Sequence, residues 1–219
     1  MNLECYARAR SRERCAASRT VNEMDANRDC TLSSSRLVLE PIQARHSELL
    51  FEQLQDPSLY RYIPTEPPTS PSALRARYER LAKRQSPDGC ETWLNWAIRL
   101  RATGEYIGAV QATVRPDAPA LLAYELGAAY RGAGYAAEAC RTVMRELVDG
   151  YGVSEIRAYV DTRNERSIRL LERLGFDRTG QIPNADYFKG ASSDEYIYSL
   201  DAFSKAAQRF DRSRRSVGS

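Results

Sequence analysis

"AYRGAGYAAEA", Ala129–Ala139, carries the strongest structural signal in the sequence, because it sets two glycines, an arginine and a run of small residues directly before a helix. Apolar residues recur at helical spacing from Gly134 to Tyr151, and a strand-like apolar run ends near Tyr130. The first N–H groups of a helix have no partner within the helix, and the helix dipole is positive there. The stretch therefore predicts an anion site at a strand-to-helix turn.

The residue types in this turn favour a pyrophosphate as the anion. Gly132 and Gly134 remove side chains that would hold a phosphate away from the backbone, and Ala133 and Ala136 keep the bulk low. Arg131 can add a charge-assisted contact at the rim. The alternative interpretation is a plain glycine turn before an ordinary helix, because glycines commonly precede helices.

A second segment, "NERSIRLLERLGF" at Asn164–Phe176, predicts another helix with marked ends. Asn164 is a candidate N-cap and Ser167 lies one turn into the helix. Gly175 follows the last apolar residue, as a glycine at a helix C-terminus does. The strand "EIRAYV" at residues 155–160 lies between the two predicted helices.

The remaining elements are arranged around these two helices. The pattern predicts a strand at residues 36–42, helical spacing after it, and an amphipathic helix with Ser70 or Ser72 as its N-cap. Two strands flank the turn at residues 102–104 as a hairpin, and later strands follow near residues 121–130, after Phe176 and at residues 195–200. This order predicts an α/β fold with a mixed, mostly antiparallel twisted sheet and helices on both faces.

Length and composition indicate one domain with two polar ends. The chain has 219 residues, of which 42% are hydrophobic and 28% charged, so it can bury one sizeable core. Residues 1–34 are rich in Arg, Ser and Ala with little apolar periodicity, and we expect them to be disordered. We expect the domain to span residues 35–201 and a basic, flexible tail to span residues 202–219.

Charge and cysteine placement exclude several classes of protein. The net charge is +3, but residues 1–35 carry +1 and residues 202–219 carry +4, which leaves −2 between them and argues against nucleic acid as a partner. The chain has no apolar run of about twenty residues and no secretory signal, so we expect no membrane span. Five scattered cysteines give no metal-binding spacing, and we expect no metal and a cytoplasmic protein with reduced thiols. The single histidine, His46, is expected to be solvated at a helix start.

The two glycine-marked segments resemble the GNAT superfamily of acyl-CoA N-acyltransferases, and within it the ribosomal-protein alanine N-acetyltransferase (RimJ/RimL-like) branch. The superfamily signature is met by Arg131–Ala136, and Glu138 and Ala139 continue it. The second helix meets the Asn, Ser, Leu-Gly-Phe pattern, and "SRLVLEPI" at residues 35–42 is similar to the first strand of that branch. The resemblance covers residues 36–200, and it implies a GNAT-type fold.

The resemblance also implies acetyl-CoA as co-substrate and direct acetyl transfer to a primary amine within a ternary complex. It implies that the pyrophosphate lies on the loop N–H groups and that the pantetheine arm lies between the strands ending at Tyr130 and Val160. The acceptor is a small amine or a protein N-terminus, and a homodimer is left open. The residues expected to bind the cofactor are Leu126, Gly127, Arg131, Gly132, Ala133, Gly134, Tyr135, Ala136 and Asn164.

The expected catalytic residues are Asp186, Glu125 and Ser167. The amine must lose a proton before it attacks, and a carboxylate can accept that proton. Asp186 matches an acidic residue of the resembled branch and ranks slightly ahead of Glu125, which lies on the strand before the turn. Many family members carry a tyrosine at the position of Leu171 that protonates the leaving thiolate; in this branch the hydroxyl of Ser167 can serve instead. A surface carboxylate and a capping serine are the plainer interpretations of these residues.

Two other functions compete with catalysis. A GNAT fold that binds acyl-CoA without turnover is compatible with the missing tyrosine. A dinucleotide-binding protein is suggested by the spacing Gly132-x-Gly134-x-x-Ala137, with Asp161 as the acid after the next strand. An antiparallel meander before the turn argues against that second alternative.

Overall fold

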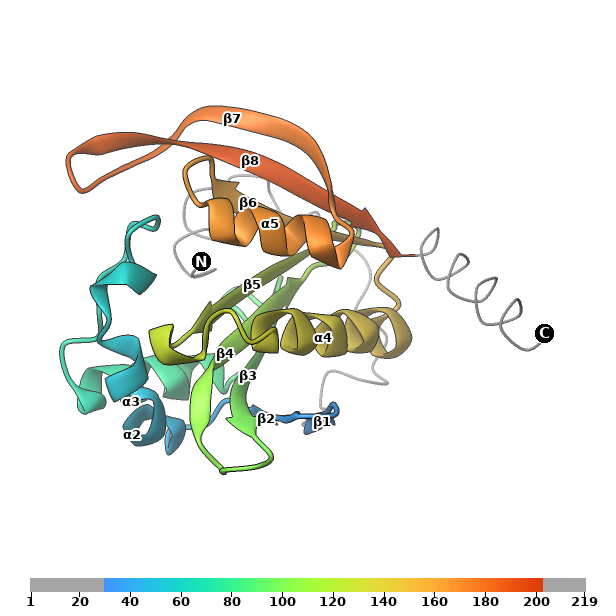
Figure 1. Ribbon diagram of the computed structural model, residues 1–219. Helices are drawn as coiled ribbons and strands as arrows, with labels where there is room; N and C mark the ends of the chain where they lie inside the picture. The colour runs from blue at the N-terminus through green and yellow to red at the C-terminus, as the bar shows by residue number, and fades with distance from the viewer. Residues whose placement is uncertain (1–29, 203–219) are drawn as a thin grey trace, which may run out of the picture.

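The computed structural model describes residues 30–202. In this part of the chain, eight strands form one sheet in the order β1-β2-β3-β4-β5-β6-β8-β7 (Figure 1). Neighbouring strands pair antiparallel, except that β5 and β6 pair parallel. The strands are β1 (Leu32–Ser33), β2 (Leu37–Pro41), β3 (Thr92–Leu100), β4 (Tyr106–Val114), β5 (Ala120–Leu126), β6 (Glu155–Asp161), β7 (Asp177–Phe188) and β8 (Ala191–Asp201).

The helices end at the residues whose side chains or conformations stop them. The Ser70 hydroxyl accepts a hydrogen bond from the N–H of Ala73, and the Asn164 side chain accepts one from the N–H of Ser167. Gly175 ends its helix in the left-handed conformation with φ +93°, which suits glycine. These three predicted helix ends are confirmed. The α-helices are α2 (His46–Leu50), α3 (Pro71–Leu81), α4 (Tyr135–Tyr151) and α5 (Glu165–Leu174), and the 3₁₀ turns are η1 (Glu52–Leu54), η2 (Pro57–Leu59) and η3 (Ala128–Tyr130).

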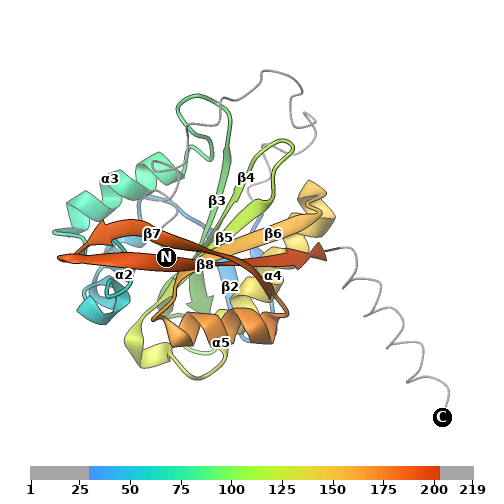
Figure 2. The same ribbon diagram turned by 90° about the horizontal axis from the view of Figure 1, so that it is seen from above.

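The helices cover both faces of the sheet, as the sequence predicts (Figure 2). On one face α4 and α5 bury Val143, Leu147 and Leu171 against the strands. On the other face α2 and α3 bury Leu50 and Tyr78. Each helix thus turns an apolar stripe toward a strand face, which makes a three-layer α/β arrangement.

The sheet opens between β5 and β6. These strands pair only at Ala120 with Ile156 and at Leu121 with Arg157. Beyond that point β5 continues to Leu126, and β6 continues to Asp161 while pairing with β8 on its other side. The two strands make no further pairs with each other. The two strands therefore diverge toward their carboxyl ends, and backbone groups along the two inner edges are left for a ligand.

The β7–β8 hairpin reaches across to the segment before α3 (Figure 1). The ammonium group of Lys189, at the hairpin turn, donates to the carbonyl of Tyr60. The same ammonium lies 3.5 Å from the Glu66 carboxylate. The hairpin tip and residues 60–66 consequently form one continuous wall on the α3 side of the sheet.

The structured core begins earlier than the sequence predicts. Leu32 and Ser33 fall inside the segment expected to be disordered, residues 1–34, yet they form β1 by pairing with Leu39 and Val38. These two residues are ordered by pairing with β2, and a strand this short has no alternating pattern by which the sequence could predict it. Residues 1–29 and 203–219 lie outside the described part of the chain, whereas the expected boundary at residue 201 coincides with the end of β8.

Candidate functional site

The glycine turn forms a loop of backbone N–H groups at the start of α4. Gly132 and Gly134 have φ +81° and +83°, a conformation that L side chains rarely adopt. The N–H groups from Gly132 through Ala137 have no acceptor among residues 30–202. A methyl group added at Gly132 would meet no heavy atom within 4 Å, so the space over the loop is open. Successive unpaired N–H groups at a helix N-terminus bind anions, and the loop fits a pyrophosphate.

Three of the expected cofactor residues have a structural role within the protein. Gly127 donates its N–H to the Ile107 carbonyl and accepts from the N–H of Tyr130. The Arg131 guanidinium donates from Nη1 to the Ser58 hydroxyl at 2.8 Å and from Nε to the Leu126 carbonyl at 3.4 Å. Asn164 uses its side-chain oxygen as the N-cap of α5. The loop is thus built mainly by the backbone of residues 132–137, with Arg131 tying it to η2.

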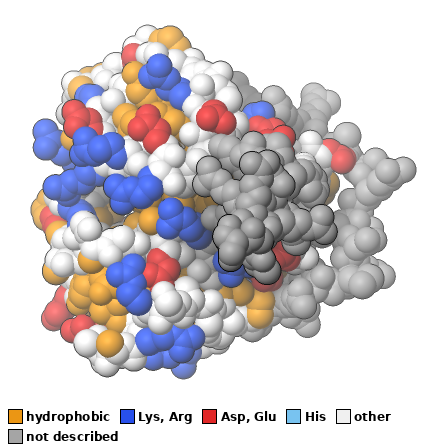
Figure 3. Space-filling view, turned by 45° about the vertical axis from the view of Figure 1, so that its right-hand side comes forward, with side chains coloured by type: hydrophobic (Ala, Val, Ile, Leu, Met, Phe, Trp, Pro, Cys, Tyr) orange, Lys and Arg blue, Asp and Glu red, His pale blue; other side chains and the backbone are white. Residues whose placement is uncertain are grey.

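The surface that carries α5 is rich in arginine. Arg166, Arg169 and Arg173 are exposed on this helix. Figure 3 shows Lys and Arg side chains gathered around a hollow on one side of the molecule. The helix also exposes Glu165 and Glu172, so its exposed charges sum to +1. This excess of positive charge favours a ligand that carries several phosphates.

Both candidate bases lie on the α3 face of the sheet. Ser193 pairs directly with Asp186, and its hydroxyl donates 2.6 Å to the carboxylate of Asp161 at the end of β6. Directly paired residues share a face and alternate residues return to it, which puts Glu125 on that face as well. The sheet register therefore brings both carboxylates to the same side of the opening between β5 and β6.

The surroundings of the two carboxylates differ. Burial raises the pKa of Tyr60 and of Tyr78, and the nearby charge of Glu125 raises both further. The Glu125 backbone pairs with Ala109 of β4, but its side chain makes no hydrogen bond or ion pair to a described residue, so the carboxylate oxygens are available to a substrate. Asp186 accepts a hydrogen bond from the N–H of Tyr187 at 2.9 Å. Glu125 lies on a strand that borders the opening, whereas Asp186 lies in the hairpin.

Ser167 lies on the opposite face, in the first turn of α5. Burial raises the pKa of the Tyr124 phenol, and hydrogen bonding with the Ser167 side chain opposes that rise. Tyr124 is a β5 residue that packs against the α4 and α5 core, so Ser167 sits beside the opening. Leu171, one turn further along α5, is buried and 1% exposed. The serine hydroxyl is thus placed across the opening from the carboxylates.

Two other polar side chains are structural. Asp161 is buried and accepts hydrogen bonds from Arg163 and Ser193, which removes the free acid that the dinucleotide interpretation requires. His46 is 0% exposed, so its predicted solvation is wrong. Its Nδ1 accepts from the N–H of Gln43 at 2.9 Å and its Nε2 lies 3.4 Å from Glu40, and burial lowers its pKa. Sequence alone could not show that the short α2 packs this ring against the sheet.

A separate cavity of 610 Å³ lies beside Glu40, Arg99 and Tyr106, and its lining residues include none of the glycine loop. No helix in residues 30–202 is long and apolar enough to cross a membrane. The same residues contain no group of three His, Cys, Asp or Glu side chains placed to hold a metal ion. The glycine loop and the opening beside it are therefore the candidate site.

Comparison with known proteins points to one family. The acetyltransferase (GNAT) domain model matches residues 36–177. The uncharacterized N-acetyltransferase p20 of Bacillus licheniformis is 27% identical over 172 residues, which cover 78% of this chain and 95% of that protein. The solved ribosomal-protein-S5-alanine acetyltransferase of Vibrio fischeri has a TM-score of 0.69 at 19% identity, covering 80% of this chain and 97% of that one. A ribosomal L7/L12 alpha-N-protein acetyltransferase in complex with coenzyme A has a TM-score of 0.68 at 18% identity, covering 77% and 95%. Because the matched residues make up more than half of its length, the chain belongs to the GNAT acetyltransferase family.

Proposed function

We propose that this chain transfers an acetyl group from acetyl-CoA to a primary amine, directly and within a ternary complex. The observation that carries the proposal is the row of N–H groups from Gly132 through Ala137, which have no acceptor among the described residues. They lie at the end of β5, where β5 and β6 diverge. That position joins an anion site to an opening through the sheet, and a ligand with a pyrophosphate followed by a long thin arm fits both.

Acetyl-CoA supplies the activated acetyl group as a thioester, and the chain's own residues do the rest. The loop N–H groups hold the pyrophosphate. The inner edges of β5 and β6 orient the extended arm through backbone hydrogen bonds. Holding the thioester and the amine in one geometry supplies much of the rate enhancement expected of such an enzyme.

Proton movement is divided between the two faces of the sheet. On the α3 face, Glu125 accepts a proton from the amine, directly or through water. On the α5 face, Ser167 donates a hydrogen bond to the sulfur that leaves. The sequence ranks Asp186 ahead of Glu125, but the structure favours Glu125, because it borders the opening and has no competing partner among the described residues. Asp186 then helps to shape the acceptor wall.

The acceptor is a primary amine of a protein N-terminus or of a small molecule. Two similar structures are named for acetyl transfer to ribosomal proteins, which makes an N-terminal peptide the first acceptor to test. The wall formed by the Lys189 hairpin tip and residues 60–66 stands on the side from which an acceptor reaches Glu125.

The test is an acceptor panel with two readouts. The full-length protein is incubated with acetyl-CoA and with peptides that begin in alanine or serine, a diamine, or an amino sugar. Release of free thiol is measured with a colorimetric thiol reagent, and the acetylated product is identified by mass spectrometry. We expect amine-dependent thiol release with a matching product. Tight acetyl-CoA binding without turnover on any amine would instead support the non-catalytic acyl-CoA-binding alternative.

A further inference from the structure

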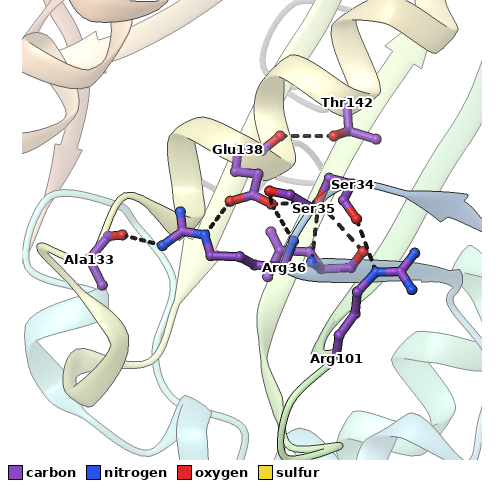
Figure 4. Close-up of polar contacts among 8 residues, drawn as sticks. Ser34, Ser35, Arg36, Arg101, Ala133, Glu138 and Thr142 are labelled. Carbon is purple, nitrogen blue, oxygen red and sulfur yellow. Dashed lines mark hydrogen bonds and ion pairs between the residues drawn. The ribbon is translucent and has the colours of Figure 1, made fainter.

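Arg36, the residue before β2, lies over the start of α4 although 102 positions separate it from Glu138 (Figure 4). Its Nε donates to the Glu138 carboxylate at 2.6 Å, and its Nη1 donates to the Ala133 carbonyl at 3.0 Å. The guanidinium carbon lies 4.6 Å from the centre of the Tyr135 ring. One arginine from the N-terminal strand thus contacts the glycine loop and the first residue of the helix.

Glu138 holds this arginine in a defined position. Its carboxylate accepts from the Ser34 and Ser35 hydroxyls at 2.7 and 3.0 Å and from the backbone N–H of Arg36 at 2.8 Å. Burial acts to raise the pKa of Glu138, but the hydrogen bonds outweigh burial and lower that pKa to about 2. The carboxylate is therefore charged at any working pH, and a charged acceptor with this many donors fixes the guanidinium plane.

The remaining edge of the guanidinium faces the loop. Its Nη2 lies 3.5 Å from where a Cβ on Gly134 would be, and it has no acceptor among residues 30–202. A guanidinium has five N–H donors, and Arg36 uses two of its nitrogens internally, so donors on Nη2 stay unused. The Arg36 side chain is 47% exposed. A cation with free donors therefore lies beside the unpaired N–H groups of the loop.

We infer that Arg36 is a direct ligand of a phosphate group of the cofactor and that Glu138 positions it. This inference rests on the proposed function, since it names a further residue of the same site. A guanidinium nitrogen with free N–H donors makes charge-assisted hydrogen bonds to phosphate oxygens, which add to the hydrogen bonds from the loop N–H groups. Arg131, the arginine of the loop's own signature, donates to the Ser58 hydroxyl. Arg36 therefore supplies a cation at the glycine loop.

The chain offers a matched control. Arg101 belongs to the same cluster, where its Nε donates to the Ser34 carbonyl at 2.9 Å, but it does not touch the loop (Figure 4). Arg36→Met and Arg101→Met each remove one positive charge and one internal hydrogen bond or more from this edge. A difference in cofactor affinity between them therefore reports the position of the charge rather than its loss.

The experiment measures binding of acetyl-CoA and of S-acetyl-pantetheine, which lacks every phosphate, to the full-length protein by calorimetry. We expect Arg36→Met to weaken acetyl-CoA binding roughly 10- to 100-fold, as loss of a charge-assisted contact does, with pantetheine binding unchanged. Arg101→Met should bind both as wild type does. Glu138→Gln should weaken acetyl-CoA binding less than Arg36→Met, because the arginine remains but is held less firmly.

Several results would overturn the inference. Equal loss for acetyl-CoA and S-acetyl-pantetheine, or normal acetyl-CoA affinity in Arg36→Met, would show that Arg36 is only a structural strut. If Arg36→Met does not fold, Arg36→Gln decides: it keeps a polar side chain but removes the charge and the guanidinium, and an unchanged acetyl-CoA affinity there would contradict a direct contact between Arg36 and a phosphate group. Failure of the proposed function is distinguishable, because the wild-type protein would then bind no acetyl-CoA, or would bind it without acetylating any amine, and neither result depends on the Arg36 variants.

Discussion

Replacing Glu138 by glutamine should lower the free energy of unfolding at neutral pH, and the loss should fade in acid. Burial acts to raise the pKa of Glu138, but hydrogen bonds from Arg36, Ser34 and Ser35 outweigh burial and lower that pKa from 4.5 to about 2. Each tenfold change in proton affinity corresponds to about 1.4 kcal/mol, so the charged form contributes on the order of 3 kcal/mol at pH 7. The side chain is only 15% exposed, so solvent screens this contribution little.

The sign follows from the direction of the pKa change. A carboxyl whose pKa is lowered on folding stabilises the folded chain above its unfolded pKa, and this stabilisation is lost as the pH falls toward 2. The difference in unfolding free energy between wild type and Glu138→Gln should therefore shrink by about 2 kcal/mol between pH 7 and pH 3.

Urea unfolding followed by circular dichroism at several pH values measures that difference. Glu165→Gln is the control, because Glu165 makes an exposed ion pair with Arg169 on α5, and its side chain is 77% exposed. Such pairs contribute less than about 1 kcal/mol, so its effect should be small at every pH. A difference between wild type and Glu138→Gln that stays constant from pH 7 to pH 3 would refute the view that the charge of Glu138 stabilises the fold through its hydrogen bonds with Arg36, Ser34 and Ser35.

Three further predictions concern catalysis and boundaries. Glu125→Gln should lower kcat by roughly 10²- to 10⁴-fold while acetyl-CoA affinity is kept, and steady-state rates that fall further in Asp186→Asn would transfer the base role to Asp186. Ser167→Ala should lower kcat more modestly, since water can replace its hydrogen bond to the leaving sulfur; an unchanged kcat in this variant would remove Ser167 from the chemistry. A chain of residues 30–202 should fold and bind acetyl-CoA, because the loop, the sheet and both helix pairs lie inside it; calorimetry that shows lost binding would mean that a terminal segment contributes to the site.

Much of the fold could be predicted because its signals are local. Helix ends depend on residues a few positions away, such as the Ser70 cap and the Gly175 stop, and both are confirmed. The β3–β4 hairpin depends on a short turn. The loop of Gly132 and Gly134 is also local, since positive φ at both positions is a property of the turn itself.

The remaining features depend on contacts between distant parts of the chain. Strand β1 has only two residues, which are too few to show a periodic pattern, so its pairing with β2 could not be predicted. His46 is buried because α2 packs on the sheet, which its neighbours in sequence do not reveal. The contact between Arg36 and Glu138 closes a span of 102 residues. The ranking of Glu125 above Asp186 needed the position of each strand, because β5 borders the opening whereas Asp186 lies in the β7–β8 hairpin.

The most direct test of acetyl-CoA binding by the glycine loop compares two glycines with the same backbone conformation. Gly132 in the loop has φ +81° and Gly104 in the β3–β4 turn has φ +78°, and a Cβ at either position would meet nothing within 4 Å. Leucine at each position should therefore cost similar backbone strain, about 1–2 kcal/mol. Calorimetric titration with acetyl-CoA should show tight binding to wild type and to Gly104→Leu but a loss of at least about tenfold in Gly132→Leu, because the side chain blocks the approach of phosphate to the backbone. Equal affinity in the two variants would contradict the assignment of the loop as the cofactor site.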